Sequence, residues 1–286
     1  MKISYNEACA LKCSSLYKDL YLCEEAGFDY IEIRLDMLKD WLKTYSIYDL
    51  KNFFDTHRLK PHAINAIYLK PNMLKNGEID FEDPTIKDFV FACEVGQYIN
   101  SGHIVIVPPF DPSGIYRGEA ERAELECSGI LSKLSVIAYK YDIKLCFEIV
   151  GLKKSYIRNI RSAINVMNKV PKDNIGLVLD IYNLYLYERL NNFEDIKLIS
   201  PEKIFAVHLT GADKVSDEEL GQDNRCFPCE CHVNIEGFLK ALKISGYDGM
   251  VSVETFRPEY WKKTPEWIIK NGYIALSNIL NKYKCL

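Results

Sequence analysis

The chain has 286 residues, of which 48% are hydrophobic and 27% are charged, and its formal net charge is −4. This composition is that of a globular protein, and it excludes an intrinsically disordered chain, which combines low hydrophobicity with high net charge. The slight acidic excess argues against a nucleic-acid binder, which usually carries a basic face. The length suits one (β/α)8 barrel of ~250 residues or two smaller α/β domains, so it leaves the domain organisation open.

The N-terminal residues contain no uninterrupted apolar stretch of the kind found in signal peptides. No stretch approaches the ~18 consecutive apolar residues of a membrane-spanning helix. The chain has ten cysteines, but a chain of this size can bury a large core without disulfides. We therefore expect a cytoplasmic protein without membrane association, in which most cysteines are reduced and buried.

Short runs typical of β-strands alternate with helical patterns along the whole chain. The runs expected to form strands are residues 2–5, 30–33, 62–66, 104–107, 144–149, 175–180, 204–209 and 250–254. Helix starts are indicated at Ser15, at the Ser46 capping box, at Asp83-Pro84, near Gly118 and at Thr264-Pro265.

Eight strands in strict alternation with eight helices indicate parallel strands joined by helical crossovers. Several strands are continuous apolar runs, as expected when both faces of a strand are buried. No linker rich in proline, glycine or serine divides the chain. We predict an α/β protein whose residues 1–286 form one domain, a (β/α)8 TIM barrel.

The last four predicted strands end on, or next to, a residue that can bind a metal ion: Glu148, Asp180, His208 and Glu254. The C-terminal ends of barrel strands meet at one mouth, so these side chains should converge. One acidic residue at a strand end often only marks the start of a loop, but four after apolar runs form a more specific pattern. Three carboxylates and an imidazole suit one divalent ion (Mn²⁺, Zn²⁺, Co²⁺ or Mg²⁺), which would also offset the repulsion between the carboxylates.

Five segments resemble a known family: residues 6–8, 28–34, 148–151, 176–180 and, most specifically, 251–260. They are similar to the xylose-isomerase-like barrel superfamily of sugar and sugar-phosphate isomerases and epimerases, and within it to the bacterial inosose isomerases of inositol catabolism. The resemblance places metal ligands on the same four residues.

The resemblance implies isomerisation of a keto-polyol, with 2-keto-myo-inositol as the expected substrate. The reaction would proceed by proton transfer through a metal-stabilised enediolate, with Glu148 and Glu254 as base and acid. Substrate contacts are expected from Arg225, Arg257, Asn183 and Glu230. Asn6, Glu7 and Arg34, which follow the first two strands, should also face the mouth.

The sequence departs from the family pattern in two places. Asn183 stands where many members have histidine, and an amide cannot carry a proton at neutral pH. The loop Arg225–Cys231 has cysteines where relatives have glycines. Within this loop Cys226, Cys229, Cys231 and His232 form a C-x-x-C-x-C-H pattern, for which we consider a structural zinc site and, with greater weight, plain reduced thiols.

Other functions stay open at this stage. A ketose 3-epimerase or an inosose dehydratase would share the first proton abstraction, and an inactive barrel that binds a polyol would need no turnover. An abasic-site endonuclease is disfavoured, because it needs further histidine ligands and the chain has only five histidines. We expect a small polyol or sugar as partner, no nucleic acid and no membrane. The exact substrate, the metal and a homo-oligomeric state are not determined by the sequence.

Overall fold

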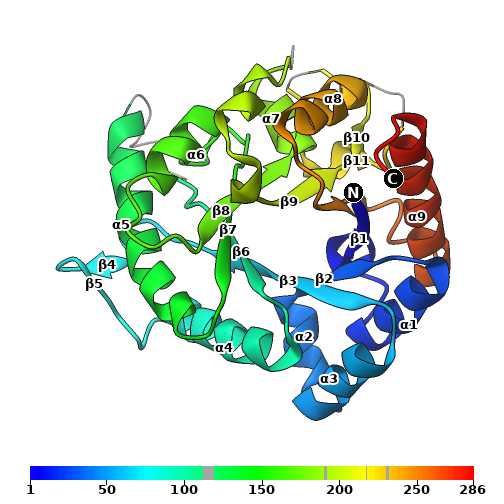
Figure 1. Ribbon diagram of the computed structural model, residues 1–286, viewed down its shortest axis with the longest axis horizontal. Helices are drawn as coiled ribbons and strands as arrows, with labels where there is room; N and C mark the ends of the chain where they lie inside the picture. The colour runs from blue at the N-terminus through cyan, green and yellow to red at the C-terminus, as the bar shows by residue number, and fades with distance from the viewer. Residues whose placement is uncertain (112–118, 190–191, 217, 230–231) are drawn as a thin grey trace.

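The protein is described by a computed structural model that covers residues 1–111, 119–189, 192–216, 218–229 and 232–286. Within these ranges, parallel strands form a closed barrel surrounded by helices (Figure 1). The barrel strands are β1 (Lys2–Asn6), β2 (Tyr30–Arg34), β3 (Lys60–Tyr68), β6 (His103–Val107), β7 (Lys144–Glu148), β8 (Ile175–Asp180), β9 (Ile204–Leu209) and β12 (Met250–Val253). Their order around the barrel is their order along the chain, which confirms the predicted (β/α)8 fold.

The helices cover the outside of the barrel (Figure 1). In the described residues they are α1 (Leu16–Ala26), α2 (Leu35–Trp41), α3 (Ile47–Thr56), α4 (Pro84–Ile99), α5 (Ala120–Tyr139), α6 (Ile160–Met167), α7 (Ile181–Tyr187), α8 (Ile235–Ser245) and α9 (Pro265–Lys282). The strict alternation that we predicted is therefore wrong at one place, because both α2 and α3 lie between β2 and β3. Leu35, Leu38 and Trp41 recur at three-residue spacing and are buried, so the signal for α2 was present in the sequence.

Two short hairpins also extend from the barrel. One consists of β4 (Leu74–Lys75) and β5 (Glu78–Ile79), and the other of β10 (Gly211–Ala212) and β11 (Arg225–Cys226). The second hairpin pairs Ala212 with Arg225 just beyond the end of β9. It therefore brings a distant loop back to the barrel mouth.

Local sequence signals start the helices as predicted, and they also end them. Ser46 and Asp49 form a reciprocal capping box at the start of α3. Thr264 caps α9 by accepting a hydrogen bond from the backbone N–H of Trp267. Gly27 ends α1 at φ 104°, a left-handed conformation that glycine adopts without a steric penalty.

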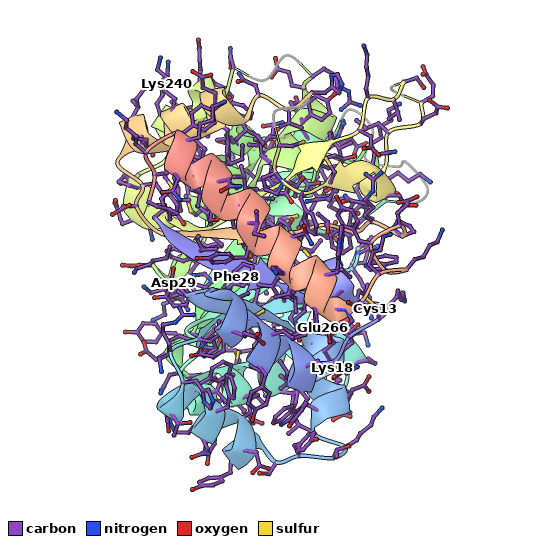
Figure 2. All side chains as sticks on the ribbon, turned by 90° about the vertical axis from the view of Figure 1, so that its right-hand side faces the viewer. Cys13, Lys18, Phe28, Asp29, Lys240 and Glu266 are labelled. Atoms are coloured by element: carbon purple, nitrogen blue, oxygen red, sulfur yellow. The ribbon has the colours of Figure 1, made fainter. Side chains whose placement is uncertain are left out.

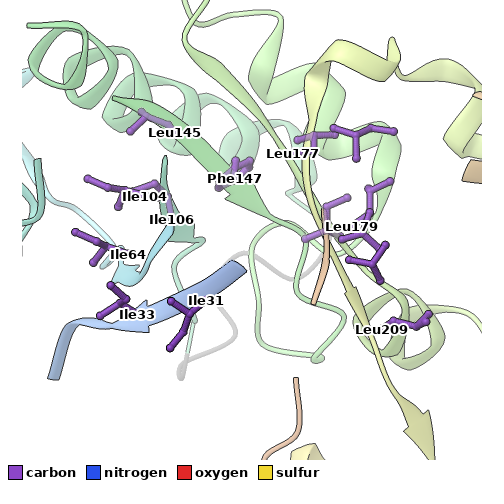
Figure 3. Close-up of a cluster of buried hydrophobic side chains, with 14 of the residues drawn as sticks. Ile31, Ile33, Ile64, Ile104, Ile106, Leu145, Phe147, Leu177, Leu179 and Leu209 are labelled. Carbon is purple, nitrogen blue, oxygen red and sulfur yellow. The ribbon is translucent and has the colours of Figure 1, made fainter. Parts of the chain in front are cut away.

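The core has two layers because successive strand side chains point to opposite faces. The larger layer lies between barrel and helices and contains Ile31, Ile33, Ile104, Ile106, Leu145, Phe147, Leu177 and Leu179 (Figure 3). The smaller layer fills the barrel with compact side chains such as Ala63, Val105, Cys146, Val178 and Ala206. Glu148 and Asp180 lie two residues after Cys146 and Val178, so they share the inward direction.

The barrel closes where β1 pairs with β12, beside helices α1 and α9. Figure 2 shows α9 lying across the outside of the barrel over Phe28. The Phe28 ring meets the Tyr273 ring of α9 edge-on, with 5.2 Å between the ring centroids. The first and last units of the chain are thereby held together.

Gly176 in β8 offers a direct test of how tightly the barrel is packed. A Cβ at this position would lie 2.7 Å from the Lys203 carbonyl oxygen and 2.7 Å from the Phe205 ring. We expect Gly176→Ala to lower the free energy of unfolding by about 1–3 kcal/mol, the usual cost of overpacking. Gly102→Ala is the matched control, because a Cβ there meets nothing within 4 Å. Equal urea midpoints for the two variants would contradict the packing described here.

Candidate active site at the barrel mouth

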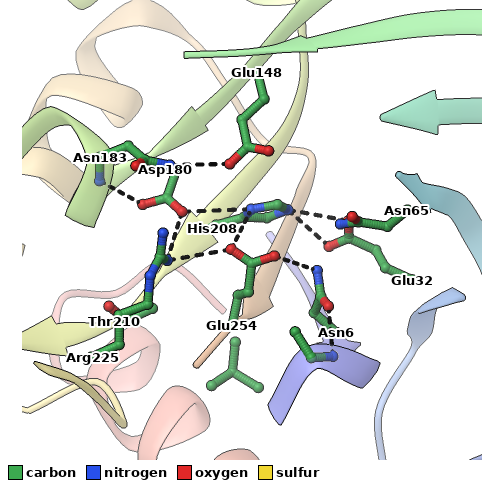
Figure 4. A network of polar contacts seen from close by, with 12 residues as sticks. Asn6, Glu32, Asn65, Glu148, Asp180, Asn183, His208, Thr210, Arg225 and Glu254 are labelled. Carbon is green, nitrogen blue, oxygen red and sulfur yellow. Dashed lines mark hydrogen bonds and ion pairs between the residues drawn. The ribbon is translucent and has the colours of Figure 1, made fainter. Parts of the chain in front are cut away.

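Four side chains predicted from separate strands converge at the C-terminal end of the barrel (Figure 4). One ligand atom from each of Glu148, Asp180, His208 and Glu254 lies within 4.8 Å of the other three, and all four residues are buried. Glu148, Asp180 and His208 belong to the ends of β7, β8 and β9, and Glu254 follows β12 directly. The convergence predicted from the sequence is thus present in the structure.

Asn183 positions Glu148. Its Nδ2 donates to Glu148 Oε1 at 3.1 Å, and its own backbone N–H donates to Asp180 Oδ1 at 2.9 Å. The Asn183 Oδ1 accepts from the Gly151 backbone N–H, and only glycine fits there, since a Cβ would lie 1.9 Å from the Asn183 carbonyl oxygen. Asn183 therefore links β7 and α7, and it holds one oxygen of each of two of the three converging carboxylates in place.

Arg225 is the cation that balances this acidic cluster. Its side chain is 1% exposed, and its Nη1 donates to Asp180 Oδ2 at 2.7 Å and to Glu254 Oε2 at 3.3 Å. The guanidinium carbon lies 4.7 Å from the centre of the Tyr182 ring and 5.5 Å from that of Phe256. Ion pairs and aromatic rings therefore fix the guanidinium at the mouth.

The carboxyl groups respond differently to burial. Burial and the nearby Glu254 raise the pKa of Glu148 to about 8. Burial would raise the pKa of Asp180 as well, but Arg225 and His208 outweigh it and hold that pKa below its usual value. Both carboxyl groups are buried, so the cations close to Asp180 account for the difference between the two pKa values.

His208 bridges the cluster and a second acid inside the barrel, Glu32 of β2. The Nε2 of His208 lies 3.1 Å from Glu32, while its Nδ1 lies 3.2 Å from Glu254 Oε2 and 3.8 Å from Asp180 Oδ2. Burial would lower the pKa of His208, but the carboxylates around it raise it well above its usual value. The buried Nδ1 makes no well-directed hydrogen bond and faces the Asp180 and Glu254 carboxylates through ion-pair contacts.

Glu32 itself was not predicted as part of the site. Burial would raise its pKa, but the charge and hydrogen bond of His208 lower it to about 2. Asn65 of β3 donates to Glu32 Oε2 at 3.3 Å. The signal in the sequence was a charged residue between Ile31 and Ile33, which places it on the inward face of an apolar strand.

Asn6 was expected at the mouth, and its Nδ2 donates to Glu254 Oε1 at 2.8 Å. Glu7 is also buried, but its carboxyl group accepts from the backbone N–H of Arg34 at 2.7 Å, away from the four-residue cluster. Arg34 pairs with Asp36 and lines a neighbouring hollow. Of these three expected mouth residues, Asn6 is the one that contacts the cluster.

A pocket of about 180 Å³ opens above the cluster. It is lined by Asn65, Tyr68, Val107, Phe110, Glu148, Val150, Leu152, Asn183, Gln222, Arg225, Glu254 and Phe256. Its walls combine hydrogen-bonding groups with aromatic and aliphatic side chains, a combination typical of small-molecule sites.

The four expected substrate-contact residues have different surroundings. Asn183 and Arg225 line the pocket. Arg257 is not among its lining residues, and its Nη1 instead binds Asp213 Oδ2 at 2.7 Å and the Arg225 carbonyl oxygen at 3.3 Å. Arg257 thus holds the backbone that carries Arg225. Glu230 lies outside the described residues.

The cysteine-rich loop follows Arg225 directly. The Sγ atoms of Cys226 and Cys229 are 3.8 Å apart, and His232 is exposed. Cys231 lies outside the described residues. Among the described residues, the side chains that come together as three or more candidate metal ligands are those of the four-residue cluster at the mouth, and the cysteines of this loop are not part of it.

Comparison with known proteins agrees with this geometry. Residues 20–271 match the family model for the xylose isomerase-like TIM barrel, so the chain belongs to that family. It is 34% identical over 284 residues to proteins named inosose isomerase from Halalkalibacterium halodurans and from Bacillus subtilis strain 168. These alignments cover 99% of this chain and 98% and 99% of those proteins.

Solved structures show the same relationship. A crystal structure described as the IOLI protein with a binding zinc atom is similar with a TM-score of 0.90 and 33% identity, covering 99% of both chains. D-psicose 3-epimerase from Clostridium cellulolyticum H10 is similar with a TM-score of 0.72 at 16% identity, which indicates a shared fold alone. None of the helices in the described residues is long and apolar enough to cross a membrane.

Substitution of Arg225 tests the charge balance of the cluster. Without the guanidinium, only His208 would offset the buried carboxylates, so we expect Arg225→Ala to lower the free energy of unfolding by about 3–5 kcal/mol in chelator-treated protein. Arg257→Ala removes a partly exposed guanidinium from the same loop and should cost less than about 1 kcal/mol. Urea unfolding followed by circular dichroism measures both. A smaller loss for Arg225→Ala than for Arg257→Ala would refute the assigned balance.

Proposed function

We propose that this protein is a divalent-metal-dependent inosose isomerase that acts on 2-keto-myo-inositol. The observation that carries the proposal is the buried cluster of three carboxylates and one imidazole at the floor of a small pocket. The curated relatives named inosose isomerase, which match over almost their whole length, support the reaction.

The residues present fit a divalent ion. Ligand oxygens and nitrogens lie about 2.0–2.2 Å from zinc, so in a tetrahedral site they are about 3.3–3.6 Å apart. The four candidate ligand atoms lie within 4.8 Å of one another, so side-chain shifts of up to about 1 Å would bring them into range. The Nδ1 of His208 supports the same conclusion, because it faces two of the carboxylates without a well-directed hydrogen bond to either. Glu148, Asp180, His208 and Glu254 would hold the ion.

A bound divalent cation would polarise the substrate carbonyl and make the neighbouring C–H group more acidic. Glu148 and Glu254 then act as the base and the acid of the proton transfer between adjacent carbons. They stand on β7 and after β12, at the two ends of the arc β7-β8-β9-β12, so they flank whatever binds between them. Asn183 holds Glu148 from one side and Asn6 holds Glu254 from the other.

The pocket suits a cyclic polyol. Phe110, Leu152 and Phe256 offer apolar surface to the C–H face of a ring, while Asn65, Gln222 and Arg225 offer hydrogen-bonding groups to its hydroxyls. Arg225 Nη1 donates hydrogen bonds to Asp180 and Glu254, and Arg225 Nε donates to Gln222 Oε1 at 2.6 Å.

We assign Arg225, Asn183, Arg257 and Glu230 to substrate binding, with Arg257 acting through the backbone of Arg225. A cytoplasmic location completes the proposal. The net charge of −4 supports a role without nucleic acid.

The reaction can be tested by following 2-keto-myo-inositol with the zinc- or manganese-loaded protein in deuterated water by NMR. We expect a positional isomer of the inosose with deuterium on the carbon that receives the proton. Glu148→Gln should reduce turnover by at least about 10²-fold, the usual contribution of a general acid or base. Glu124→Gln is the control, since Glu124 is a buried acid on the outer helix α5.

Other results of this experiment would identify a different reaction or a different function. Isomerisation without deuterium in the product would replace proton transfer by hydride shift. A changed configuration at one carbon, or a dione, would identify an epimerase or a dehydratase. Binding of inososes and ketoses without turnover would identify a polyol-binding barrel.

Glu32 should hold His208 in the orientation that metal binding needs. A metal ligand must be the neutral imidazole, and in that form an Nε2–H that donates to Glu32 leaves Nδ1 without a proton and facing the other three ligands. We expect Glu32→Gln, which keeps the size of the side chain, to weaken zinc binding by about 10–100-fold. Competition with a chromophoric chelator measures this. Glu7→Gln, a second buried glutamate that does not contact the cluster, should leave zinc affinity unchanged, and equal effects of the two substitutions would argue against this role.

A further inference from the structure

Two carboxyl groups are buried side by side outside the barrel mouth, and the mechanism uses neither of them. Glu7 follows β1 directly, Asp19 lies on the inner face of α1, and both residues are 0% exposed. Their carboxyl groups are in hydrogen-bonding contact with each other. Two ionised carboxylates cannot form a hydrogen bond, because each can only accept. The contact therefore requires a proton on one of the two groups.

The other hydrogen bonds of the pair show where that proton is needed. Glu7 Oε2 accepts from the backbone N–H of Arg34 at 2.7 Å, and Asp19 Oδ1 accepts from the Ser14 hydroxyl. The second oxygen of each group, Glu7 Oε1 and Asp19 Oδ2, is buried without a donor from the described residues. Burial of a carboxylate oxygen without a donor is costly. A proton held between the two groups supplies the donor that the pair lacks.

The charged groups around the pair do little to stabilise two negative charges there. The guanidinium of Arg34 is turned to Asp36, with Nε and Nη2 at 3.0 and 2.9 Å from its two carboxylate oxygens. Lys18 is exposed on α1, so water weakens its effect. Glu266 of α9 is exposed and acts on Cys13. The remaining titratable groups that face the pair are acids themselves, namely Tyr5, Cys9, Cys13 and Cys23.

Burial is the main influence on both carboxyl groups. It raises the pKa of Asp19 to about 7 and the pKa of Glu7 well above its usual value. In the unfolded chain both groups would lose their protons near about pH 4. At neutral pH the folded chain therefore keeps a proton that the unfolded chain has lost. The stability that this proton supplies is largest at low pH and falls as the pH rises towards the pKa of the folded state.

We propose that Glu7 and Asp19 share one proton at neutral pH, and that this proton holds helix α1 against the segment that follows β1. That segment is the 3-10 helix η1 (Glu7–Ala10). At alkaline pH the proton leaves to solvent, and two negative charges then repel each other in the core between η1 and α1. The pair is thus a pH-sensitive contact within the first βα unit of the barrel.

Glu7→Gln tests the shared proton, because glutamine imitates a protonated Glu7. Its amide N–H can donate to Asp19, and its amide oxygen can still accept from the backbone N–H of Arg34. We expect the variant to fold and its unfolding constant to depend less on pH. Between pH 7 and pH 8 the unfolding constant of the natural chain should rise about tenfold more than that of the variant, the effect of one retained proton. Urea unfolding of the chelator-treated, full-length chains measures both constants.

Glu124→Gln is the matched control. Glu124 is a buried acid of α5 that has polar partners, since Lys169 Nζ lies 3.7 Å and Asn165 Nδ2 lies 3.2 Å from its Oε2. This substitution should leave the pH dependence of the natural chain unchanged. Infrared spectra at pH 7 give a second readout. The natural chain should show the carbonyl-stretch band of a protonated carboxyl group that is missing from Glu7→Gln.

Several results would overturn the proposal. The natural chain and Glu7→Gln could show the same pH dependence, or their infrared spectra could lack the expected difference. A Glu124→Gln chain whose pH dependence falls as much as that of Glu7→Gln would also contradict it. So would a Glu7→Gln chain that does not fold, because the amide supplies the same hydrogen bonds as the protonated acid. None of these measurements involves a substrate or a metal ion, so their outcome is independent of the isomerase assay.

Discussion

Burial of charge inside the barrel is the constraint on which the rest of this site depends. Glu32, Glu148, Asp180 and Glu254 are all removed from solvent, and the groups that offset them are His208 and Arg225. A buried carboxylate without a partner is costly, so each of these side chains is tied to at least one other by a hydrogen bond or ion pair. The network leaves little freedom in the position of any one member. That rigidity is what a site for proton transfer requires, because the reacting groups must be held before the substrate arrives.

Much of this arrangement follows from strand parity and could be predicted from the sequence. Apolar runs that end on Glu148, Asp180, His208 and Glu254 are local signals, and the rule that parallel strands share a mouth converts them into a cluster. Glu32 was missed because its role depends on a contact across the barrel with His208, 176 residues later in the chain. Nothing in local sequence reports which inward residues on opposite strands will meet.

The loops were harder to predict than the strands for the same reason. Arg257 was expected to contact substrate, yet it binds Asp213 and the backbone of Arg225, a contact that depends on the β10–β11 hairpin. Loop conformations are set by several such non-local contacts, whereas the strands are specified by short local runs of apolar residues. Solved structures that are only 15–16% identical to this chain share its barrel fold.

The hydrogen bond between Asn6 and Glu254 joins residues 248 positions apart, across the seam where β1 meets β12. A partly folded chain in which this seam is open lacks the complete set of ligands, even if β7, β8 and β9 are already in place. Cation affinity is then a property of the closed barrel, and by linkage any cation that binds the closed barrel more tightly also favours closure. Cation binding at the active site would therefore stabilise the fold itself, because it favours the pairing of the last unit of the chain with the first.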